Sequence, residues 1–529
     1  MRFAATQQVS QVLSRPAPVK GLNAYDSIIG MPEGFALVLR NLFAQPYGVK
    51  VRNGYVRHSS GLEGPVETLM SHNALTKKLY AFSQGALNAT LYDVTLPNDP
   101  PVVKSSSLTN ARWQHINFPN AAGVNLVAVN GADDMLWIKN DGTIVTVVAG
   151  DGTGNTIKGI DPKKLIHVYA HQKRLWFTEK DSTYGWYLPP DQITGEAYGF
   201  DFGPNWTRGG QLLQIITWTI DDGNGADDHL AAISTEGEVS IYQGIDPDDT
   251  STWALQGVYY AGAPVGRRAA CRDGGDVLII TEFGTVNLSD LLKSTKVNPT
   301  EGNNGKYIQQ LVSVAVSSFR DLFGWQPFIY PGDNMVIINI PTSVENSFQF
   351  VMNDITKAWS EFLGYVANCW ELHQQLPFYG GYGAVYRAWE GHTDDAVIAN
   401  DGTVTAGADI RAEAQTTYTN FGNQVLNKHF KMVRPSILSS GGFEVSIAAN
   451  VNYSFQSVPS PVSFDTYLPG RWDEDYWDSA RWAGGLIAYS EWITVRGIGF
   501  VASLRLLLST NAETFWASSD WLFEPGGVM

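Results

Sequence analysis

Residues 125–147, NLVAVNGADDMLWIKNDGTIVTV, decide the fold. A short apolar strand through Ala128 and Val129 is followed by a polar turn and by a second strand, residues 136–138, that carries a tryptophan. Apolar residues recur with a period of two in both strands, which is typical of half-buried β-strands joined as a hairpin. One such hairpin cannot bury both of its faces. The pattern therefore predicts that several copies stack against one another.

The same unit of strand, polar turn and aromatic strand recurs along the chain at intervals of roughly 40 to 65 residues, close to the length of a propeller blade. The other copies are KLYAFSQGALNATLYDV (78–94), LIHVYAHQKRLWFTEKDSTYGWYL (165–188), HLAAISTEGEVSIYQG (229–244), RRAACRDGGDVLIITEFGTVNL (267–288), NMVIINIPTSVENSFQFVMNDITKAWSEF (334–362) and PFYGGYGAVYRAWEGHTDDAVI (377–398). Radial stacking of these units predicts an all-β fold with a β-propeller of six or seven degenerate blades. Two packed β-sandwiches are the alternative, but they would give shorter and more even strand spacing.

The extent of the repeats predicts three regions. Residues 1–65 are expected to form an N-terminal arm and strands that pack on a platform, with a short helical segment at residues 35–43 and a turn at Asn53-Gly54. Residues 66–421 are expected to form the propeller. Residues 422–529 contain two strong strands, 444–448 and 450–455, and predict a β-sandwich-like platform domain.

Composition restricts the possible functions. Lys and Arg number 36 against 52 Asp and Glu, which gives a formal charge of −16, and charged residues make up only 17% of the chain. Gripping nucleic acid needs clustered cations, so the sign is wrong for a DNA-binding protein. A surface of like charge would nevertheless let DNA slide past without sticking. The low charge density fits a subunit that covers much of its surface with neighbours.

Cysteines and the N-terminal segment exclude other classes. Cys271 and Cys369 are too few for a disulfide framework and lack metal-ligand spacing, so both are expected to be small buried side chains. The N-terminal residues MRFAATQQVSQVLSRPAPVKG contain no long apolar run, so we expect neither a signal peptide nor a membrane anchor. The protein is therefore expected to be made in the cytoplasm.

The loop DDGNGADD at residues 221–228 is the densest run of carboxylates. Oxygen ligands from Asp222, Asn224 and Asp228 could suit calcium, but the loop lacks the distal bidentate glutamate of an EF-hand, and a solvated hairpin tip is the favoured interpretation. Together with Asp248 and Asp249 of the acidic stretch at residues 247–249 it supplies candidates for a channel lining of negative charge. These lumen candidates are Asp221, Asp222, Asp227, Asp228, Asp248 and Asp249.

The segment RWDEDYWDSARW at residues 471–482 mixes four carboxylates with tryptophans. A glycosidase needs paired carboxylates and aromatic rings that stack on a sugar. These carboxylates, however, lie in one short segment outside the repeats, whereas a propeller enzyme draws its residues from several blades. Trp and Arg are enriched at protein interfaces, which favours an interaction surface. The interface candidates are Arg471, Trp472, Asp475, Trp477, Asp478, Arg481 and Trp482.

No other constellation in the sequence predicts chemistry. The nine histidines are scattered, and there is no HExxH helix, Ser-His-Asp spacing or nucleophile elbow. His167 and His171 are four residues apart in a strand-turn pattern, which disfavours a shared metal. The sequence therefore predicts no catalytic, cofactor-binding or metal-binding residues, and a protein that is not an enzyme.

Several stretches together resemble a family of virion proteins from short-tailed bacteriophages, and they occur in the same order along nearly the whole chain. NLFAQPYGVKVRNGYVRHSSGLEGPVETL (41–69) is similar to the family's opening, N-x-[FW]-P…V-x-x-R-x-G-[YF]-x-x-H-x-x-G-L, except that Ala44 stands where the family usually has proline. ARWQHINFPNAAGVNLVAVNG (111–131) resembles the next element, and residues 350–395 resemble a late-blade signature. KHFKMVRP (428–435) and FEPGGVM (523–529) complete the series.

The resemblance implies a tail nozzle or tail hub protein without cofactor or catalytic residues. Such subunits form a ring, typically a hexamer, below the portal and the head-to-tail adaptor protein. The ring continues the channel for the viral genomic DNA, a passenger that does not stick, and carries tail fibres or tailspikes that meet the host outer surface. The implied location is the virion tail, assembled in the cytoplasm of the host bacterium. A propeller glycosidase or depolymerase of host surface glycans is the alternative, and a scaffold for host proteins ranks third.

Overall fold

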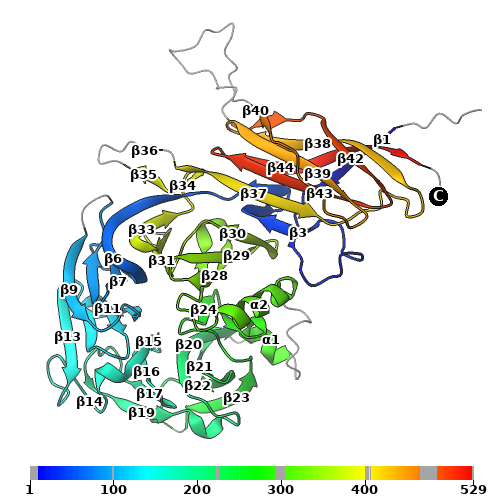
Figure 1. The fold of residues 1–529 in the computed structure, drawn as a ribbon. Coiled ribbons are helices and arrows are strands. Elements are labelled where there is room, and N and C mark those ends of the chain that lie inside the picture. Colours follow the sequence, from blue (N-terminus) through cyan, green and yellow to red (C-terminus); the bar gives the residue numbers. More distant parts are fainter. Residues whose placement is uncertain are drawn as a thin grey trace, which may run out of the picture.

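The computed structural model describes residues 10–97, 101–221, 226–249, 251–293, 304–398, 404–405, 407–464 and 485–526. Nearly all of these residues are in strands, turns or loops, and they build a propeller joined to a β-sandwich (Figure 1). In this described part the propeller has seven blades, which confirms the predicted fold and fixes the blade number.

Each blade is a small sheet whose first strand is the innermost. Blade 1 consists of β6 (Tyr55–His72), β7 (Lys78–Gln84), β8 (Ala89–Asp93) and β9 (Val102–Leu108). Blade 2 consists of β10 (Gln114–Asn120), β11 (Gly123–Val129), β12 (Met135–Ile138) and β13 (Ile144–Ala149), extended by β14 (Thr156–Lys158) and β18 (Gly195–Glu196). Blade 3 consists of β15 (Leu165–His171), β16 (Arg174–Glu179), β17 (Tyr184–Tyr187) and β19 (Tyr198–Asp201), and blade 4 of β20 (Leu212–Asp221), β21 (Ala226–Ser234), β22 (Glu238–Gln243) and β23 (Ala254–Tyr260). The pairings within the blades are antiparallel except for β13–β14 and β14–β18 at the outer side of blade 2.

Blade 5 has three strands in the described part of the chain and is followed by two helices. Blade 5 consists of β24 (Ala270–Asp273), β25 (Asp276–Thr281) and β26 (Gly284–Asn287), and α1 (Leu288–Lys293) and α2 (Gln309–Phe319) follow it. Blade 6 consists of β27 (Gln326–Tyr330), β28 (Met335–Ser343), β29 (Asn346–Asn353) and β30 (Ala358–Leu363). Blade 7 consists of β31 (Cys369–His373), β32 (Leu376–Gly380) and β33 (Tyr382–Ala388), and the first half of β6 completes it. Short pieces β34 (Thr393–Asp394), β35 (Ala396–Ile398) and β36 (Val404–Thr405) follow.

The ring closes through the long strand β6. Its first half pairs with β33 from Tyr55 to Pro65, and its second half pairs with β7 from Val66 to His72. One strand is therefore the outermost of blade 7 and the innermost of blade 1. The innermost strands of successive blades contact each other all the way round, so the inner edge of each blade is short and lies next to the inner edges of its neighbours.

Burial between blades explains why the repeats stack. In the described residues, six of the seven interfaces between neighbouring blades each hold a separate cluster of buried apolar side chains, and the interface of blades 5 and 6 is part of the larger cluster that fills the sandwich. Between blades 3 and 4, for example, Trp176 stacks on Trp253 with ring centroids 5.9 Å apart. The period-two alternation of the sequence units is thus the alternation between two neighbouring blades.

The sandwich consists of both ends of the chain, so the propeller is inserted into it (Figure 1). One sheet contains β1 (Gln11–Pro16), β4 (Leu42–Gln45), β5 (Gly48–Val51), β38 (Lys428–Ser439), β41 (Ile487–Tyr489), β42 (Ile493–Gly499) and β44 (Thr514–Pro525). The other contains β2 (Gly21–Leu22), β3 (Phe35–Arg40), β37 (Ala408–Thr416), β39 (Phe443–Val451), β40 (Val462–Phe464) and β43 (Ala502–Thr510). Alternate residues of β43, Leu504, Leu506 and Leu508, are buried in its core.

The second sandwich sheet continues into the propeller without a break. The outer strand of blade 6, β30, pairs in parallel with β2 at Gly21 and Trp359 and with β3 at Arg40 and Glu361. The buried cluster of the sandwich also extends through α2 to blades 5 and 6. Propeller and sandwich therefore share both a sheet and a core.

Three sequence-based expectations about the first and last regions are wrong. Residues 35–43 form β3 and the start of β4 rather than a helix, because pairing with β37 and β30 satisfies their backbone. Asn53-Gly54 is not a hairpin turn, because β5 pairs within the sandwich while β6 pairs within the propeller. In place of the two strands expected at 444–448 and 450–455 there is one strand, β39, which ends at Val451, and residues 452–455 lie beyond it.

Strand pairing also moves both domain boundaries. Residues 55–65, expected in the N-terminal arm, complete blade 7, and residues 408–416, expected in the propeller, form a central strand of the sandwich. Propeller and sandwich are therefore separated near residues 52 and 407 rather than at 65 and 421.

Gly54 lies at the first of these crossings, where a side chain has no room. A Cβ built on Gly54 would lie 1.8 Å from the carbonyl oxygen of Thr393. We expect Gly54→Ala to lower the free energy of unfolding by about 1–3 kcal/mol or more, because backbone must move to relieve the clash. Urea unfolding followed by tryptophan fluorescence measures the loss. Gly30→Ala is the matched control, since nothing lies within 4 Å of its Cβ position, and equal losses at both sites would contradict the steric explanation.

Candidate functional sites: the domain junction and the central cavity

The junction between propeller and sandwich is built around Arg52, whose side chain is fully buried. Its guanidinium donates to both carboxylate oxygens of Asp394, at 2.7 and 2.6 Å. It also donates to the carbonyl oxygens of Leu363 (2.7 Å) and Asn53 (3.0 Å), and its Nε donates to Oδ1 of Asn41 (3.0 Å). All five N–H groups of the arginine are thus satisfied, as a buried charge requires.

Aromatic rings surround this ion pair. The Arg52 guanidinium lies 4.4 Å from the centroid of the Tyr365 ring, and the Tyr365 hydroxyl donates to the carbonyl of Asn53 at 2.5 Å. Tyr55 packs against Tyr365, Tyr379 and Tyr386 with centroids 5.4–5.8 Å apart. The aromatic shell keeps water away and strengthens the charged hydrogen bonds inside it.

The junction joins two segments that are far apart in the sequence. Asn41, Arg52, Gly54 and Tyr55 come from residues 41–69, and their partners Leu363, Tyr365, Thr393 and Asp394 come from residues 350–395. These are the opening and late-blade stretches on which the resemblance to tail proteins rests. Their motif residues therefore have a shared structural task, which is to hold the two domains in one orientation.

Polar side chains near the start of the innermost strands form hydrogen bonds with the backbone of the next blade, and we call these contacts clasps. Gln214 on β20 donates to the carbonyl of Ala270 (3.0 Å) and accepts from its N–H (3.3 Å). Gln326 on β27 makes the same pair of bonds to Trp370 on β31, both at 3.0 Å. Thr68 on β6 likewise bonds Trp113 and Ala111 next to β10. The clasps satisfy backbone groups that face the axis.

We expect Gln214→Leu to lower the free energy of unfolding by about 1–3 kcal/mol, because it leaves a buried backbone donor and acceptor of Ala270 unpaired. Chemical unfolding measures the change. The exposed Gln211, three residues earlier, provides the matched control Gln211→Leu, which should change stability by less than about 0.5 kcal/mol. A loss at Gln211 as large as that at Gln214 would rule out the clasp.

A cavity of about 220 Å³ lies on the propeller axis, lined by residues from all seven innermost strands or the turns that lead into them. Its polar lining consists of Gln114, His115, His167, Tyr169, Gln214, Arg268, Arg272, Gln326 and Glu371. His115 and Glu371 are paired, with Nε2 and Oε2 3.3 Å apart.

Arg268 crosses the ring where the innermost strands begin. It precedes β24 of blade 5, yet it donates to the carbonyl of Glu67 (3.1 Å), to Thr68 Oγ1 (2.7 Å) and to the carbonyl of Trp113 (2.9 Å). These acceptors belong to blades 1 and 2, on the opposite side of the seven-membered ring. Arg268 and Arg112 also lie over the ring of Phe323, 5.2 and 4.7 Å from its centroid. This mouth of the axial cavity is therefore bridged by side chains.

Two buried histidines stand beside the axis. Burial lowers the pKa of His167 to about 3 and that of His171 to about 4. His171 is hydrogen-bonded through Nδ1 to Thr217 Oγ1 (2.9 Å), whereas Nδ1 of His167 has no partner among the described residues. Both rings are thus neutral near pH 7. Residues that could share a metal with them do not gather there, because no group of three His, Cys, Asp or Glu suited to a metal occurs within the described ranges.

The predicted site residues are distributed as follows. All seven interface candidates, Arg471 to Trp482, and the lumen candidate Asp222 lie outside the described residues, as does Asn224. Asp221 ends β20, and the exposed Asp227 and Asp228 begin β21. Asp248 accepts from the hydroxyl of Tyr187 (2.5 Å), and Asp249 accepts from the N–H of Ser251 (3.0 Å). Asp227, Asp228, Asp248 and Asp249 thus lie at one end of blade 4, and none of them lines the axial cavity.

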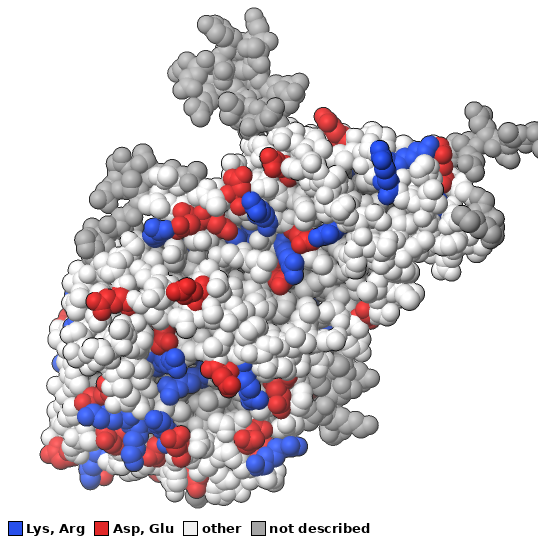
Figure 2. All heavy atoms as spheres, in the orientation of Figure 1, with Lys and Arg blue, Asp and Glu red and all other residues white. Residues whose placement is uncertain are grey.

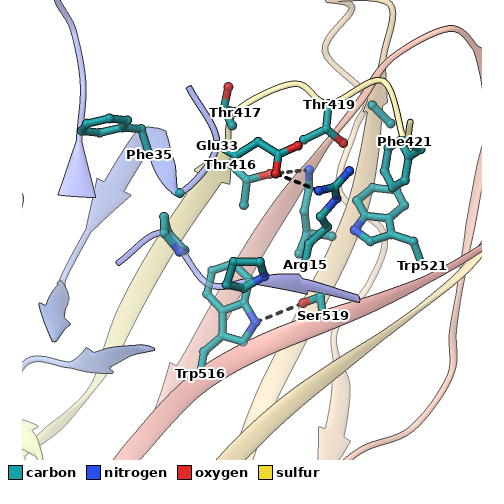
Figure 3. A pocket seen from close by; sticks show the side chains of 15 residues that line it. Arg15, Glu33, Phe35, Thr416, Thr417, Thr419, Phe421, Trp516, Ser519 and Trp521 are labelled. Carbon is teal, nitrogen blue, oxygen red and sulfur yellow. Dashed lines mark hydrogen bonds and ion pairs between the residues drawn. The ribbon is translucent and has the colours of Figure 1, made fainter. Parts of the chain in front are cut away.

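A second hollow lies within the sandwich (Figure 3). Its volume of about 30 Å³ holds one or two water molecules. Arg15 and Glu33 form an ion pair of 2.7 Å at its edge, and the Arg15 guanidinium lies 5.5 Å from the centroid of Phe421. This hollow is a packing gap rather than a ligand site.

Sequence analysis missed the residues that matter most at both sites. Arg52 and Asp394 belong to quoted motifs, but nothing local indicated that they meet. The pairs Trp113-Gln114 and Trp325-Gln326 are a detectable signal, since each glutamine follows a tryptophan at the start of an innermost strand. Arg268 carries no local signal, because its partners lie in blades 1 and 2.

The geometry defines a nearly all-β protein in which a seven-bladed propeller is inserted into a β-sandwich, with a cavity on the propeller axis that side chains bridge at one mouth. No family model and no curated protein matches the chain. Among solved structures it is similar to the propeller proteins BBS1N, solved in complex with ARL6DN (10% identity, TM-score 0.37, 65% of this chain and 99% of that one), and Sqt1 of Saccharomyces cerevisiae (9%, 0.37, 69% and 96%).

PorZ, a surface component of the type-IX secretion system of Porphyromonas gingivalis, is similar at 13% identity and TM-score 0.40, over 82% of this chain and 59% of that one. At such low scores these likenesses carry no argument about function. Among the described helices, none is long and apolar enough to span a membrane.

Proposed function

We propose that the protein is a structural subunit of the tail nozzle or hub ring of a short-tailed bacteriophage. The observation that carries the proposal is the junction: two of the stretches that resemble tail proteins meet in space and hold propeller and sandwich together around Arg52 and Asp394. A ring subunit needs such a lock, because each domain must meet a different neighbour in a fixed direction.

The small size of the axial cavity determines where DNA would pass in the proposed ring. Arg268 bridges the propeller axis, and the cavity of about 220 Å³ is far too small for a duplex. In the proposed ring the DNA channel therefore lies between subunits, on the ring axis, and not through any one propeller. The exposed carboxylates Asp227, Asp228, Asp248 and Asp249 would supply negative charge to that channel, which repels the phosphates of DNA.

The surface suits a subunit with several neighbours. On the face shown in Figure 2, charged side chains of both signs are intermixed over the propeller, and much of the surface is uncharged. In the proposed assembly this surface would contact further copies in the ring, the adaptor protein above and tail fibres or tailspikes outside. Contacts in a closed ring are heterologous, so two different faces of each subunit would meet.

Assembly tests the proposal directly. We expect the purified full-length protein, alone or mixed with the adaptor of its phage, to form rings of one fixed stoichiometry in negative-stain images and mass photometry. The rings should not degrade host capsule or lipopolysaccharide. A monomer that cleaves polysaccharide, and loses this activity in Asp475→Asn, would overturn the nozzle proposal in favour of a depolymerase. A protein that stays monomeric with its adaptor present would also contradict it.

The charge of the channel is tested separately. Replacing Asp227, Asp228, Asp248 and Asp249 together with lysine should slow DNA ejection while leaving ring formation intact, because cations would bind the passing phosphates. Ejection from assembled particles is timed at low salt. The control replaces the exposed Asp141 and Asp151 of blade 2 with lysine. Unchanged ejection in the blade 4 variant would refute the electrostatic role without touching the ring itself.

A further inference from the structure

We propose that the axial cavity is a binding site for a small oxyanion, held by Gln114, His167, Arg268 and Arg272. This inference does not depend on the ring proposal. It rests on unpartnered polar atoms, on charge that protein carboxylates leave uncompensated, and on the size of the cavity.

Two side chains of the cavity wall lack partners. The Nε2 of Gln114 and the Nδ1 of His167 are buried without a hydrogen-bond partner among the described residues, and the two side chains are only 9% and 6% exposed. Gln114 occupies the position on β10 that Gln214 and Gln326 occupy on β20 and β27, but it clasps no neighbouring strand. A buried polar atom without a partner is costly, so a ligand that accepts from the Gln114 amide, and from the His167 ring in the tautomer that carries its proton on Nδ1, would be stabilised here.

The two arginines of the cavity outnumber the single carboxylate in its lining. Of the two carboxylates that act most strongly on Arg268, Glu67 is bound by Arg112 (3.2 Å), whereas Glu371 lies 3.3 Å from His115, which compensates its charge only when the imidazole is protonated. Arg268 itself bonds only neutral groups, namely carbonyls and a hydroxyl, besides the nearby thiol of Cys369. Protein surrounds Arg268, yet it keeps some accessible surface, as expected for a group that lines an internal cavity.

A second cation, Arg272, lies four residues further along the chain, on β24. It is exposed, lines the cavity and donates to Thr219 Oγ1 at 2.7 Å. The cavity is thus locally positive in a chain whose formal charge is −16. Because of this contrast, an anion is bound more favourably inside the cavity than at the outer surface.

Size and donor chemistry define the ligand class. A volume of about 220 Å³ admits a small ion with a few waters but excludes a peptide or a nucleic acid. Amide, imidazole and guanidinium N–H groups all donate, and arginine pairs well with planar or tetrahedral groups that carry several negative oxygens. Phosphate and small carboxylates share this chemistry, so both sources are compared in the test.

The test uses the full-length protein in a buffer free of phosphate and carboxylates. Inorganic phosphate and, separately, succinate are titrated by calorimetry, and thermal unfolding is recorded with and without each anion. We expect saturable binding of at least one anion at one site per chain, with a rise in Tm. Gln114→Leu and Arg272→Gln should each weaken binding by tenfold or more.

Gln114→Leu keeps the test clear of folding effects. Because its amide has no protein partner, the variant should unfold at the same or a higher temperature than the wild type without anion, and its Tm should no longer respond to the anion. Arg57→Gln, a surface cation outside the cavity, is the control and should bind as the wild type does. Absence of saturable binding by either anion, a cavity that holds water only, or undiminished binding in Gln114→Leu would each overturn the proposal.

Discussion

Replacing Arg52 with methionine is expected to lower the free energy of unfolding by about 3–5 kcal/mol, the usual cost of removing one partner of a buried ion pair. The loss arises because Asp394 would keep its charge in a largely buried position without its two guanidinium bonds. Asn41 and the carbonyl of Leu363 would lose their partner as well. Equilibrium unfolding in guanidinium chloride, followed by tryptophan fluorescence, measures the change.

The adjacent pair Arg57–Asp395 is a matched control. Its nitrogen and oxygen are also 2.6 Å apart, but the two side chains are 37% and 44% exposed, so water already solvates them. Arg57→Met should therefore cost only about 0.2–1 kcal/mol. Equal losses for the two methionine variants would show that burial at the junction does not set the energy of the Arg52 pair.

The junction variant has a second readout. If Arg52 and Asp394 hold the domains together, Arg52→Met should expose the crossing at residues 52–54 to protease faster than Arg57→Met does. The rate of proteolysis of Arg52→Lys is expected to lie between the rates of Arg52→Met and Arg57→Met, because an ammonium group keeps the charge but cannot bond both carboxylate oxygens in a planar fork. A lysine variant as stable as the wild type would contradict the role of the bidentate geometry.

Lowering the pH from 6.5 to 4.5 is expected to destabilise the protein by about 2–3 kcal/mol for each of His167 and His171. The folded pKa values, about 3 and about 4, are depressed by burial. The unfolded chain therefore takes up protons first, near pH 6.5. The stabilising effect of the neutral rings is complete above that pH and is lost as the pH falls toward the folded pKa values.

The measurement is the slope of the free energy of unfolding against pH, in buffers without phosphate or carboxylates. The double variant His167→Asn/His171→Asn should show a slope smaller by nearly two protons between pH 6 and 4.5. His429→Asn, at an exposed position of β38, is the control and should leave the slope unchanged. A double variant with the wild-type slope would mean that these two histidines do not govern acid unfolding.

Features of the fold that depend on neighbouring residues could be predicted from the sequence, whereas features that depend on contacts between distant residues could not. Alternation in units such as 125–147 is a local property, and it predicted strands, their hairpins and the number of blades to within one. Residues 35–43 are apolar enough for either a helix or a strand, and only their partners β37 and β30 decide in favour of a strand. At Asn53-Gly54 a strong turn signal is overridden, because its flanking strands enter different sheets.

The sites depended still more on the tertiary structure. The axial cavity takes residues from seven strands spread between Leu69 and Glu371, so no window of sequence contains it. Arg268 and its acceptors are separated by about 155–201 positions, and Arg52 and Asp394 by 342. Side chains so distant in sequence meet only because ring closure through β6 brings the first and last blades together.

The sequence by itself determined that this chain is a repeat of β-hairpins attached to a further β domain, since burial of alternate residues demands stacked sheets. It also determined the acidic, sparsely charged composition. The tertiary structure alone decided that β6 closes the ring, that the propeller is inserted into the sandwich near residues 52 and 407, and that the axis holds a positive cavity in a negative protein. The physical reason is that strand pairing, ion pairs and cavities depend on which distant segments lie side by side, and periodicity does not record that.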